Sequence, residues 1–419
     1  MRLFSPATIF LAKGLSRGKV RQGTHHLSSI LRLTTIGVAL SLSVMLLSVT
    51  IILGFHRQIH EFAFSQTGHI SLNGYGSDWK TSTTPIRISP RLLTYLRDQA
   101  DIETATPLVQ QAGLLKTKDD FSGILLYGID SSFRSRYFEE NIRSGSFPSF
   151  ATTSGDRPPI VLPSHVARRM GYQVGDHIRI YFFGEKMRIR VFELQAIYES
   201  TGLELSPALC PITTLQKLNH WDEHTFSRLL IMLREPDKAG AVLEHIITSL
   251  QARPDLIGEE NYGMNLGQEL QPELFNWLAF LDTNVYALLS LMLLVGGFAM
   301  ITGLIIIVLD KSRQIGILKA LGATNSQLRQ TFLLIAARLI LKGVLWGNLL
   351  ALTLSLVQRH YKVIKLNPAN YFTDAVPIHF DLALWLGINV GTLLVILLMV
   401  IVPASLVSRI HPAESMRID

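Results

Sequence analysis

Four long apolar runs constrain the fold of this chain more than any other feature of its sequence. A helix needs roughly 20 mostly apolar residues to cross the hydrocarbon core of a bilayer. The runs that meet this length lie at residues 34–55, 284–309, 331–357 and 382–407. Charged residues make up 17% of the chain, below the average of about 25% for soluble domains. The sequence therefore predicts a membrane protein with four transmembrane helices.

The first run is predicted to be a retained helix rather than a cleaved signal peptide. A signal peptide has an apolar core of about 7–15 residues, followed by a cleavage site made of small residues. Residues 34–55 are longer than such a core and uncharged throughout, and the segment from Gly54 to Arg57 contains no cleavage pattern.

Basic residues in the short loops set the predicted orientation, because Lys and Arg concentrate on the cytoplasmic side of membrane proteins. Residues 1–33 contain six Lys and Arg and no Asp or Glu, and residues 310–330 carry four basic residues against one Asp. We therefore expect both termini in the cytoplasm. The loop 358–381 carries three basic residues and departs mildly from the rule.

This orientation divides the charge of the chain as well as its length. Residues 56–283 hold 22 Lys and Arg against 27 Asp and Glu, so they carry a formal charge of −5, and the rest of a chain at +7 carries +12. The excess positive charge faces the anionic lipid of the cytoplasmic leaflet, and we expect no nucleic-acid partner. The predicted boundaries are 1–33 for a cytoplasmic basic segment with an interfacial helix at 5–20, 34–55 for the first transmembrane helix, 56–283 for a large extracytoplasmic domain, 284–309 for the second helix, 310–330 for a cytoplasmic loop, 331–357 for the third helix, 358–381 for a short extracytoplasmic loop, 382–407 for the fourth helix and 408–419 for a cytoplasmic tail.

The extracytoplasmic domain is predicted to mix strands and helices. Stretches rich in β-branched and aromatic residues predict strands, and apolar residues at helical spacing predict helices. The strands are expected at 69–72, 178–183, 188–198 and 229–233, and the helices at 91–99 and 239–251.

No motif for catalysis or nucleotide binding is present in the sequence. The chain lacks a phosphate-binding loop, a serine nucleophile elbow and a cysteine pair for zinc, so we expect no enzyme activity, no cofactor and no metal in this chain. The pairs His56/His60 and His220/His224 have the spacing of two metal ligands, but a catalytic zinc site needs a third. A polar extension of the first helix and a solvated turn explain these pairs equally well.

Two cationic residues fall inside the third apolar run. Arg338 and Lys342 are one helical turn apart, so they share a helix face. Charged residues within a membrane usually face a bundle interior or a cavity, whereas long basic side chains can also reach back to the interface. Both interpretations stay open.

The loop between the second and third runs, DKSRQIGILKALGATNSQLRQ, predicts a short amphipathic helix. Ile315, Leu318 and Leu321 recur at intervals of three residues, Gly322 can end the helix, and Thr324 or Asn325 can cap the next one. A helix of this kind can fit a groove on a cytoplasmic partner or serve as a plain interfacial linker.

This loop resembles the coupling helix of FtsX-like and MacB-like ABC transporter permeases, which docks on the ATPase subunit. The segments RSGSFPSF, PPIVLPSHVARRMGYQVGDHIRI and STGLELSPALCPITTLQKL resemble the extracytoplasmic domain of that family, and PASLVSRIHPAESMRID resembles its C-terminus. The first run and its continuation HRQIHEFAFSQTGHISL are most similar to the lipoprotein-releasing permeases of the LolC and LolE type. The resemblance implies a MacB-like periplasmic domain in the α+β class.

The resemblance also implies the function and the partners of the chain. It implies an inner-membrane permease subunit that extracts lipoproteins from the outer leaflet, and that works with two copies of a separate ATPase, which binds ATP and Mg²⁺. A second permease subunit, of the same or a related chain, and a periplasmic lipoprotein chaperone are the other expected partners. The expected contacts to the ATPase are Gln314, Ile315, Leu318, Lys319, Leu321 and Gly322; the family usually has Glu at the position of Gln314.

The expected substrate cavity is lined by the first and second runs, where apolar walls suit acyl chains. Ordinary helix packing explains any one of these side chains equally well. The candidates are Met45, Val49, Ile52, Leu288, Met292 and Phe298.

Two other kinds of function remain open. The same machine could export a different cargo, as in MacB-like efflux, or control a cell-wall hydrolase, as in FtsX-like signalling. The extracytoplasmic domain could also be a sensor or an adhesin on a four-helix anchor, although a mere anchor would not need the coupling helix.

Overall fold

The computed structural model divides the chain into two compact units, which are described one at a time. It describes residues 25–76, 84–116, 121–133, 135–150, 157–183, 187–200, 206–257, 260, 262–367, 371 and 373–406. The helical unit comprises the described residues of 1–56, 279–364 and 376–419, and the sheet unit those of 57–278 and 365–375. The predicted interfacial helix at 5–20 and the tail 408–419 lie outside the described residues.

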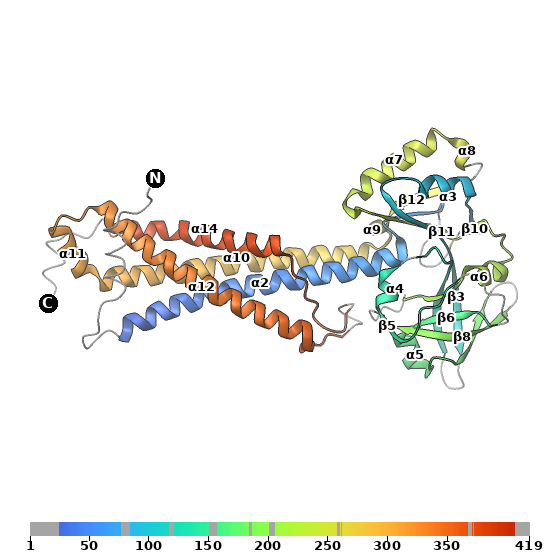
Figure 1. The fold of residues 1–419 in the computed structure, drawn as a ribbon, viewed down its shortest axis with the longest axis horizontal. Helices are drawn as coiled ribbons and strands as arrows, with labels where there is room; N and C mark the ends of the chain where they lie inside the picture. Colours follow the sequence, from blue (N-terminus) through green and yellow to red (C-terminus); the bar gives the residue numbers. More distant parts are fainter. Residues whose placement is uncertain are drawn as a thin grey trace. The chain divides into compact units, whose positions relative to one another are not determined.

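Four helices of the described chain are long and apolar enough to cross a membrane, which confirms the predicted number. They are α2 (His25–Thr67), α10 (Pro272–Asp310), α12 (Asn325–Tyr361) and α14 (Leu382–Leu406), and they are visible in Figure 1. Three of them extend beyond the apolar runs that marked them in the sequence. An apolar run marks only the part of a helix that can lie in the hydrocarbon core. Polar residues continue the same helix beyond that part, because no capping residue ends it there.

Helix α2 is the centre of the helical unit, and small residues let its neighbours approach closely. A Cβ added to Gly37 would lie 2.9 Å from Ala299 of α10, and one added to Gly343 of α12 would lie 2.7 Å from Val38. On the same faces, Gly303 lies against Thr34, and the Ser41 hydroxyl donates a hydrogen bond to the Met292 carbonyl. Such close approach gains van der Waals contact, which drives helix association where the hydrophobic effect cannot.

Helices α12 and α14 are joined by polar side chains within their apolar runs. The Asn348 amide donates to the Asn389 carbonyl oxygen over 2.6 Å, and the Trp385 indole donates to the Asn348 carbonyl oxygen over 2.7 Å. The three side chains satisfy one another, so none of these groups is left facing hydrocarbon without a partner, a condition that costs free energy. This cluster fixes the register between the two helices.

A short helix, α11 (Ser312–Ala320), connects α10 to α12. It ends in a Schellman motif, in which Gly322 adopts φ +94° and the N–H groups of Gly322 and Ala323 donate to the Lys319 and Leu318 carbonyls. Thr324 then caps α12 in a reciprocal capping box with Gln327. The expected helix end at Gly322 is thus confirmed, and of the two candidate caps, Thr324 and Asn325, the structure uses Thr324.

The sheet unit is built around one mixed sheet, and ten of its described strands belong to it. The strand order is β12-β1-β11-β3-β4-β9-β6-β8-β5, with β7 paired to β3 and β8. The pairs β4–β9 and β6–β8 are parallel and the others antiparallel. The sheet strands are β1 (Ile70–Gly74), β3 (Ile102–Lys116), β4 (Phe121–Ile129), β5 (Ile142–Gly145), β6 (Pro159–Pro163), β7 (His177–Phe182), β8 (Arg188–Tyr198), β9 (Ala208–Pro211), β11 (Arg228–Leu233) and β12 (Tyr262–Leu266), while β2 (Ile86–Arg87) and β10 (Thr225–Phe226) form a separate pair.

Amphipathic helices cover this sheet and complete one apolar core. The helices α3 (Pro90–Arg97) and α7 (Ala239–Gln251) bury the leucines and other apolar residues that the sequence placed at helical spacing. The six strand and helix positions predicted for this domain are therefore confirmed, within a residue or two at their ends. The remaining helices are α4 (Arg136–Glu140), α5 (Ser164–Met170), α6 (Ile212–Asn219), η1 (Pro236–Lys238), α8 (Pro254–Ile257) and α9 (Gly267–Leu270).

The core of the sheet unit also contains a buried cation. Arg228 of β11 is 1% exposed and donates to the Gln110 side chain and to the Tyr127 hydroxyl, each over 2.7 Å. Burial raises the pKa of Tyr127, and the adjacent guanidinium opposes that rise. These three polar side chains link β3, β4 and β11 inside the sheet unit.

We predict that Gly347→Ala destabilises the helical unit. The added Cβ would lie 2.8 Å from the Ala39 carbonyl oxygen, and backbone atoms of α2 cannot rotate out of the way. Overpacking of this kind costs about 1–3 kcal/mol, which a lower unfolding temperature in detergent would report. The control is Gly391→Ala on α14, where no heavy atom lies within 4 Å; equal shifts in the two variants would contradict tight packing at Gly347.

Candidate functional site

The helix α11 is anchored to the helical unit by part of its apolar face. Ile315 is fully buried and belongs to a core cluster with Leu328 and Phe332 of α12. Leu318 is half-buried and packs against the same cluster. These side chains therefore hold α11 in place, because they pack against other residues of the same chain.

The exposed face of α11 carries the apolar surface that a partner could reach. Ile317 is 46% exposed and Leu321 is 79% exposed, and the two lie one helical turn apart on the same side. Gln314 and Gly322 are also exposed, whereas Lys319 is half-buried. Ile317 was not among the residues expected from the sequence, because a regular spacing of apolar residues cannot say which of them face the chain's own core.

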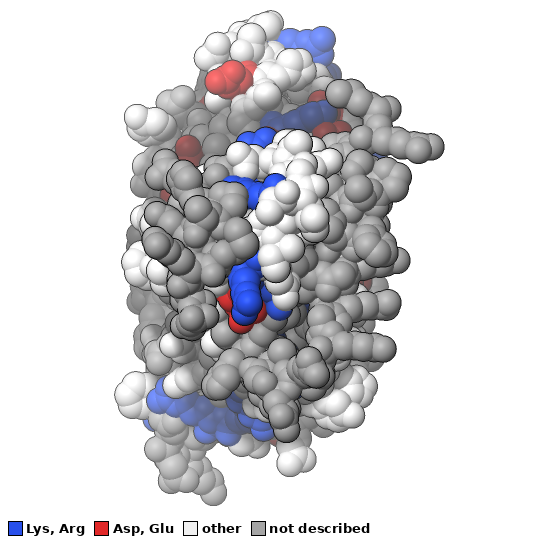
Figure 2. Space-filling model, turned by 90° about the vertical axis from the view of Figure 1, so that its left-hand side faces the viewer, with Lys and Arg blue, Asp and Glu red and all other residues white. Residues whose placement is uncertain are grey.

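Basic side chains lie on and next to α11 along the chain. Arg313 and Arg329 are exposed, and Lys311 is largely buried beside Asp310, with its Nζ 3.4 Å from the carboxylate. Figure 2 faces this end of the molecule and shows basic side chains at its centre, with fewer acidic ones among the described residues. The surface thus combines a small apolar patch with positive charge.

The residues proposed for a substrate cavity divide between buried and exposed positions. Met45 and Ile52 are buried, Phe298 is 59% exposed, and Val49, Leu288 and Met292 are half-buried. Helices α2 and α10 run antiparallel, and the close approach of Gly37 to Ala299 and the contact of His56 with Asp282 fix their register. This register brings Met45 to the depth of Met292 and Val49 to the depth of Leu288.

The two cationic residues inside the apolar run of α12 differ in their surroundings. Arg338 is half-buried, and Lys342 is exposed on the surface of the helical unit. Lys342 shares that surface with Leu341 and Leu345, which are 55% and 69% exposed. Within this chain, therefore, Lys342 does not face the interior of the four-helix unit.

The histidine pairs have structural partners. His56 of α2 lies 2.8 Å from the Asp282 carboxylate of α10, and His60 packs against the rings of Phe64 and Phe275. His220 ends α6 in a left-handed conformation, and His224 lies beside Glu223. Across the described part of the chain, no cluster of three or more His, Cys, Asp or Glu residues could hold a metal ion.

His69, at the start of the sheet unit, is a buried histidine that the sequence did not single out. Its Nδ1 accepts the Leu233 N–H over 2.9 Å, and Phe64 packs edge-on against its ring. Burial, with a smaller contribution from His60, lowers the pKa of His69 from 6.5 to about 4. The imidazole is therefore neutral in the folded protein at neutral pH.

We predict that His69 makes the protein less stable in mild acid. Between pH 6.5 and about 4 the unfolded chain binds a proton at His69 that the folded chain does not, so stability present above pH 6.5 is lost as the pH falls. The check is the unfolding temperature at pH 7.5 and at pH 5 in the intact protein and in His69→Asn, whose side-chain oxygen can still accept the Leu233 N–H. The variant should show a smaller decrease; an identical decrease would contradict the assignment.

Comparisons with known proteins cover nearly the whole chain. A model described as the FtsX-like permease C-terminal region matches residues 286–412, and a model described as the MacB-like periplasmic core domain matches residues 32–248. A lipoprotein-releasing system transmembrane protein LolC from Xylella fastidiosa is 22% identical over 100% of this chain and 100% of that protein. A LolE protein of the same system from Haemophilus influenzae is 22% identical over 97% of this chain and 98% of its own. A macrolide export ATP-binding/permease protein MacB from Neisseria gonorrhoeae is 20% identical over 80% of this chain and 52% of its own.

Proposed function

Because this chain belongs to the family of ABC transporter permeases with an FtsX-like C-terminal region and a MacB-like periplasmic core domain, we propose that it extracts lipoproteins from the outer leaflet of the inner membrane. As a permease the chain is a non-catalytic membrane subunit, and its proposed location is the inner membrane, with a periplasmic domain. The proposed energy source is ATP hydrolysis, with Mg²⁺, on two copies of a separate cytoplasmic ATPase. Full-length similarity to two lipoprotein-release proteins supports this cargo over others.

The observation that carries the proposal is the geometry of α11. Ile315 holds this short helix to the helical unit, and Ile317 and Leu321 face outward. The helix can therefore receive force from a partner and pass it to α12, which begins only a few residues later. An amphipathic helix placed in a groove is a common mode of recognition between proteins. We therefore assign the ATPase contact to Gln314, Ile317, Leu321 and Gly322, while Ile315 and Leu318 hold the helix and Lys319 lies at its edge.

The proposed topology follows from this contact. If α11 meets a cytoplasmic ATPase, both chain ends lie on the cytoplasmic side and the sheet unit lies in the periplasm, which agrees with the excess of basic residues at residues 1–33. A second permease subunit, of the same or a related chain, completes the transporter. Each acyl CH₂ moved into an apolar cavity contributes about 0.8 kcal/mol. Of the candidate wall residues, half-buried Val49, Leu288 and Met292 are best placed to hold lipid, whereas Met45 and Ile52 are buried and Phe298 is 59% exposed.

A MacB-like efflux function is the second candidate. The match to a MacB-like periplasmic core and the similarity to a macrolide exporter favour it over signalling to a cell-wall hydrolase. The two candidates differ in cargo, and both use the same coupling helix.

The function is tested with the full chain, co-purified with its ATPase and reconstituted in proteoliposomes that contain an acylated lipoprotein. We expect ATP to release the lipoprotein to a soluble periplasmic acceptor. ATP hydrolysis without lipoprotein release, together with ATP-dependent movement of a macrolide, would replace this proposal with the efflux function.

We predict that Leu321→Asp reduces ATPase co-purification and lipoprotein release by tenfold or more. Leu321 is 79% exposed, so the substitution removes partner contact and leaves the chain's own core intact. The control is Leu382→Asp, because Leu382 is 73% exposed at the first residue of α14, far along the chain from α11. Unchanged co-purification of Leu321→Asp, with an unchanged unfolding temperature, would contradict the contact.

A further inference from the structure

The connection between α12 and α14 does not belong entirely to the helical unit. The chain leaves that unit at residue 364 and returns to it at residue 376, and residues 365–375 are part of the sheet unit. We name residues 365–375 the connecting segment; residues 368–370 and 372 are outside its described part. The sheet unit is thus joined to α12 and α14 by covalent links of their own, in addition to those through α2 and α10.

On the side of the helical unit, Gln358 fixes both ends of this connection to the last turn of α12. Its Nε2 donates to the Ile364 and Val376 carbonyl oxygens over 3.1 Å each, and its Oε1 accepts the Ile364 N–H over 2.9 Å. The Val376 N–H in turn donates to the Ile364 carbonyl. Gln358 is 7% exposed whereas Ile364 is 57% exposed, so these bonds are partly buried, and removing the amide would take this partner from three backbone groups.

On the side of the sheet unit, the connecting segment forms a narrow antiparallel pair. Lys365 lies opposite Ala375, and the Leu366 N–H donates to the Asp374 carbonyl over 2.8 Å. Thr373 and Ala375 are each 8% exposed. The end of the segment is therefore packed into the sheet unit and does not extend as a free loop.

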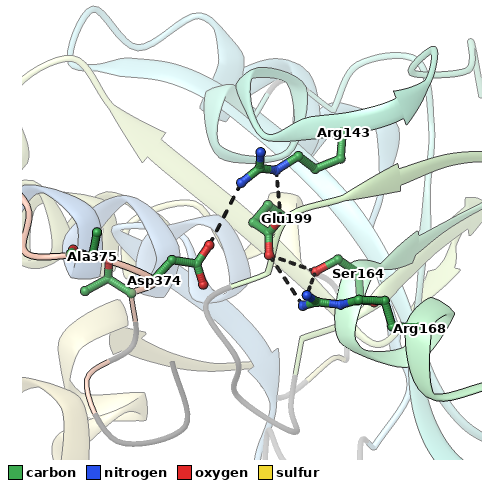
Figure 3. A network of polar contacts seen from close by, with 7 residues as sticks. Arg143, Ser164, Arg168, Glu199, Asp374 and Ala375 are labelled. Carbon is green, nitrogen blue, oxygen red and sulfur yellow. Dashed lines mark hydrogen bonds and ion pairs between the residues drawn. The ribbon is translucent and has the colours of Figure 1, made fainter. Parts of the chain in front are cut away.

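An ion network holds the Asp374 end of the segment (Figure 3). The Arg143 guanidinium of β5 donates to the Glu199 carboxylate over 2.7 Å and lies 3.9 Å from the Asp374 carboxylate. Glu199 follows β8, is 20% exposed, and also accepts from the Ser164 hydroxyl of α5, with Arg168 3.7 Å away. Arg143 is thus positioned by the sheet and its covering helix before it meets Asp374.

The strengths of these contacts decide which is the main anchor. The Arg143–Asp374 pair is 57% and 42% exposed, and exposed ion pairs of this kind contribute little by themselves. The three hydrogen bonds of Gln358 contribute more together, because they are partly buried and converge on one side chain that is itself 7% exposed. Arg143 determines where the segment attaches to the sheet unit, and Gln358 holds both ends of the segment to α12, so that the segment moves with that helix.

We propose that the connecting segment is a coupling anchor in which Gln358 ties it to α12 and Arg143 ties it to the sheet unit. A displacement that α11 receives and α12 carries then reaches the sheet unit through residues 365–375 as well as through α2 and α10. Gln358 and Arg143 are positioning residues. The coupling role rests on the proposed function, while the anchor itself rests on the contacts alone.

Hydrogen exchange in the intact reconstituted complex tests the anchor without reference to any cargo. Exchange of the Leu366 N–H should accelerate about fivefold in Asp374→Asn and in Arg143→Gln, as expected for loss of an exposed ion pair, and tenfold or more in Gln358→Met. The matched control is Arg168→Gln, which also removes a guanidinium beside Glu199 but does not touch Asp374. Unchanged exchange in both Arg143→Gln and Gln358→Met would overturn the anchor.

The amount of lipoprotein released per ATP hydrolysed tests the coupling role. We expect this ratio to decrease severalfold in Gln358→Met and in Arg143→Gln, with ATP hydrolysis retained, and to stay unchanged in Arg168→Gln. Arg143→Lys should recover part of the ratio, because it restores the charge. Faster exchange with an unchanged ratio would overturn coupling and leave a structural role. If the unsubstituted complex releases no lipoprotein, the proposed function fails, and the exchange experiment still decides the anchor.

Discussion

The close approach of α10 and α12 to α2 is the contact on which the rest of the helical unit depends. Glycines on α10 and α12 lie directly against side chains or backbone of α2. In a lipid environment, apolar surface gains nothing by leaving lipid, so association depends on such van der Waals fit. Because α10 and α12 pack against different residues of α2, the depth of each is fixed relative to the same helix.

Polar contacts then hold α14 and the 377–379 stretch to the helices that the small residues bring together. The Asn348, Asn389 and Trp385 side chains join α14 to α12, and the 377–379 stretch lies against α2, where the His379 N–H donates to the Thr50 carbonyl. Each of these polar groups has a partner inside the unit, as the low dielectric of its surroundings favours. Helix α14 is the least buried of the four candidate spans, so these few bonds weigh more in its placement than they would in a buried helix.

This arrangement separates the side chains that hold α11 from those that face outward. Ile315 is committed to the core with α12, so the helix cannot slide without disturbing Leu328 and Phe332. A force applied at Leu321 is therefore received by an element already packed on α12. The transport proposal and the coupling anchor both use this property, the first at the α11 end of α12 and the second at its Gln358 end.

Apolar run length and local spacing were enough to predict the four spans, a domain of mixed strands and helices, a cap at Thr324 or Asn325 and the turn at Gly322, because these depend on residues close together in sequence. Other features depend on partners between about 10 and 230 residues away in the sequence. They are the exposure of Ile317 on α11, the contact of Asn348 with Asn389, the burial of His69 and Arg228, and the attachment of residues 365–375 to Arg143. Spacing along one helix shows that it has an apolar face, but the face that turns inward is chosen by what packs against it. Tertiary structure alone decides that choice, since burial is a property of the contacts between elements and not of any one element.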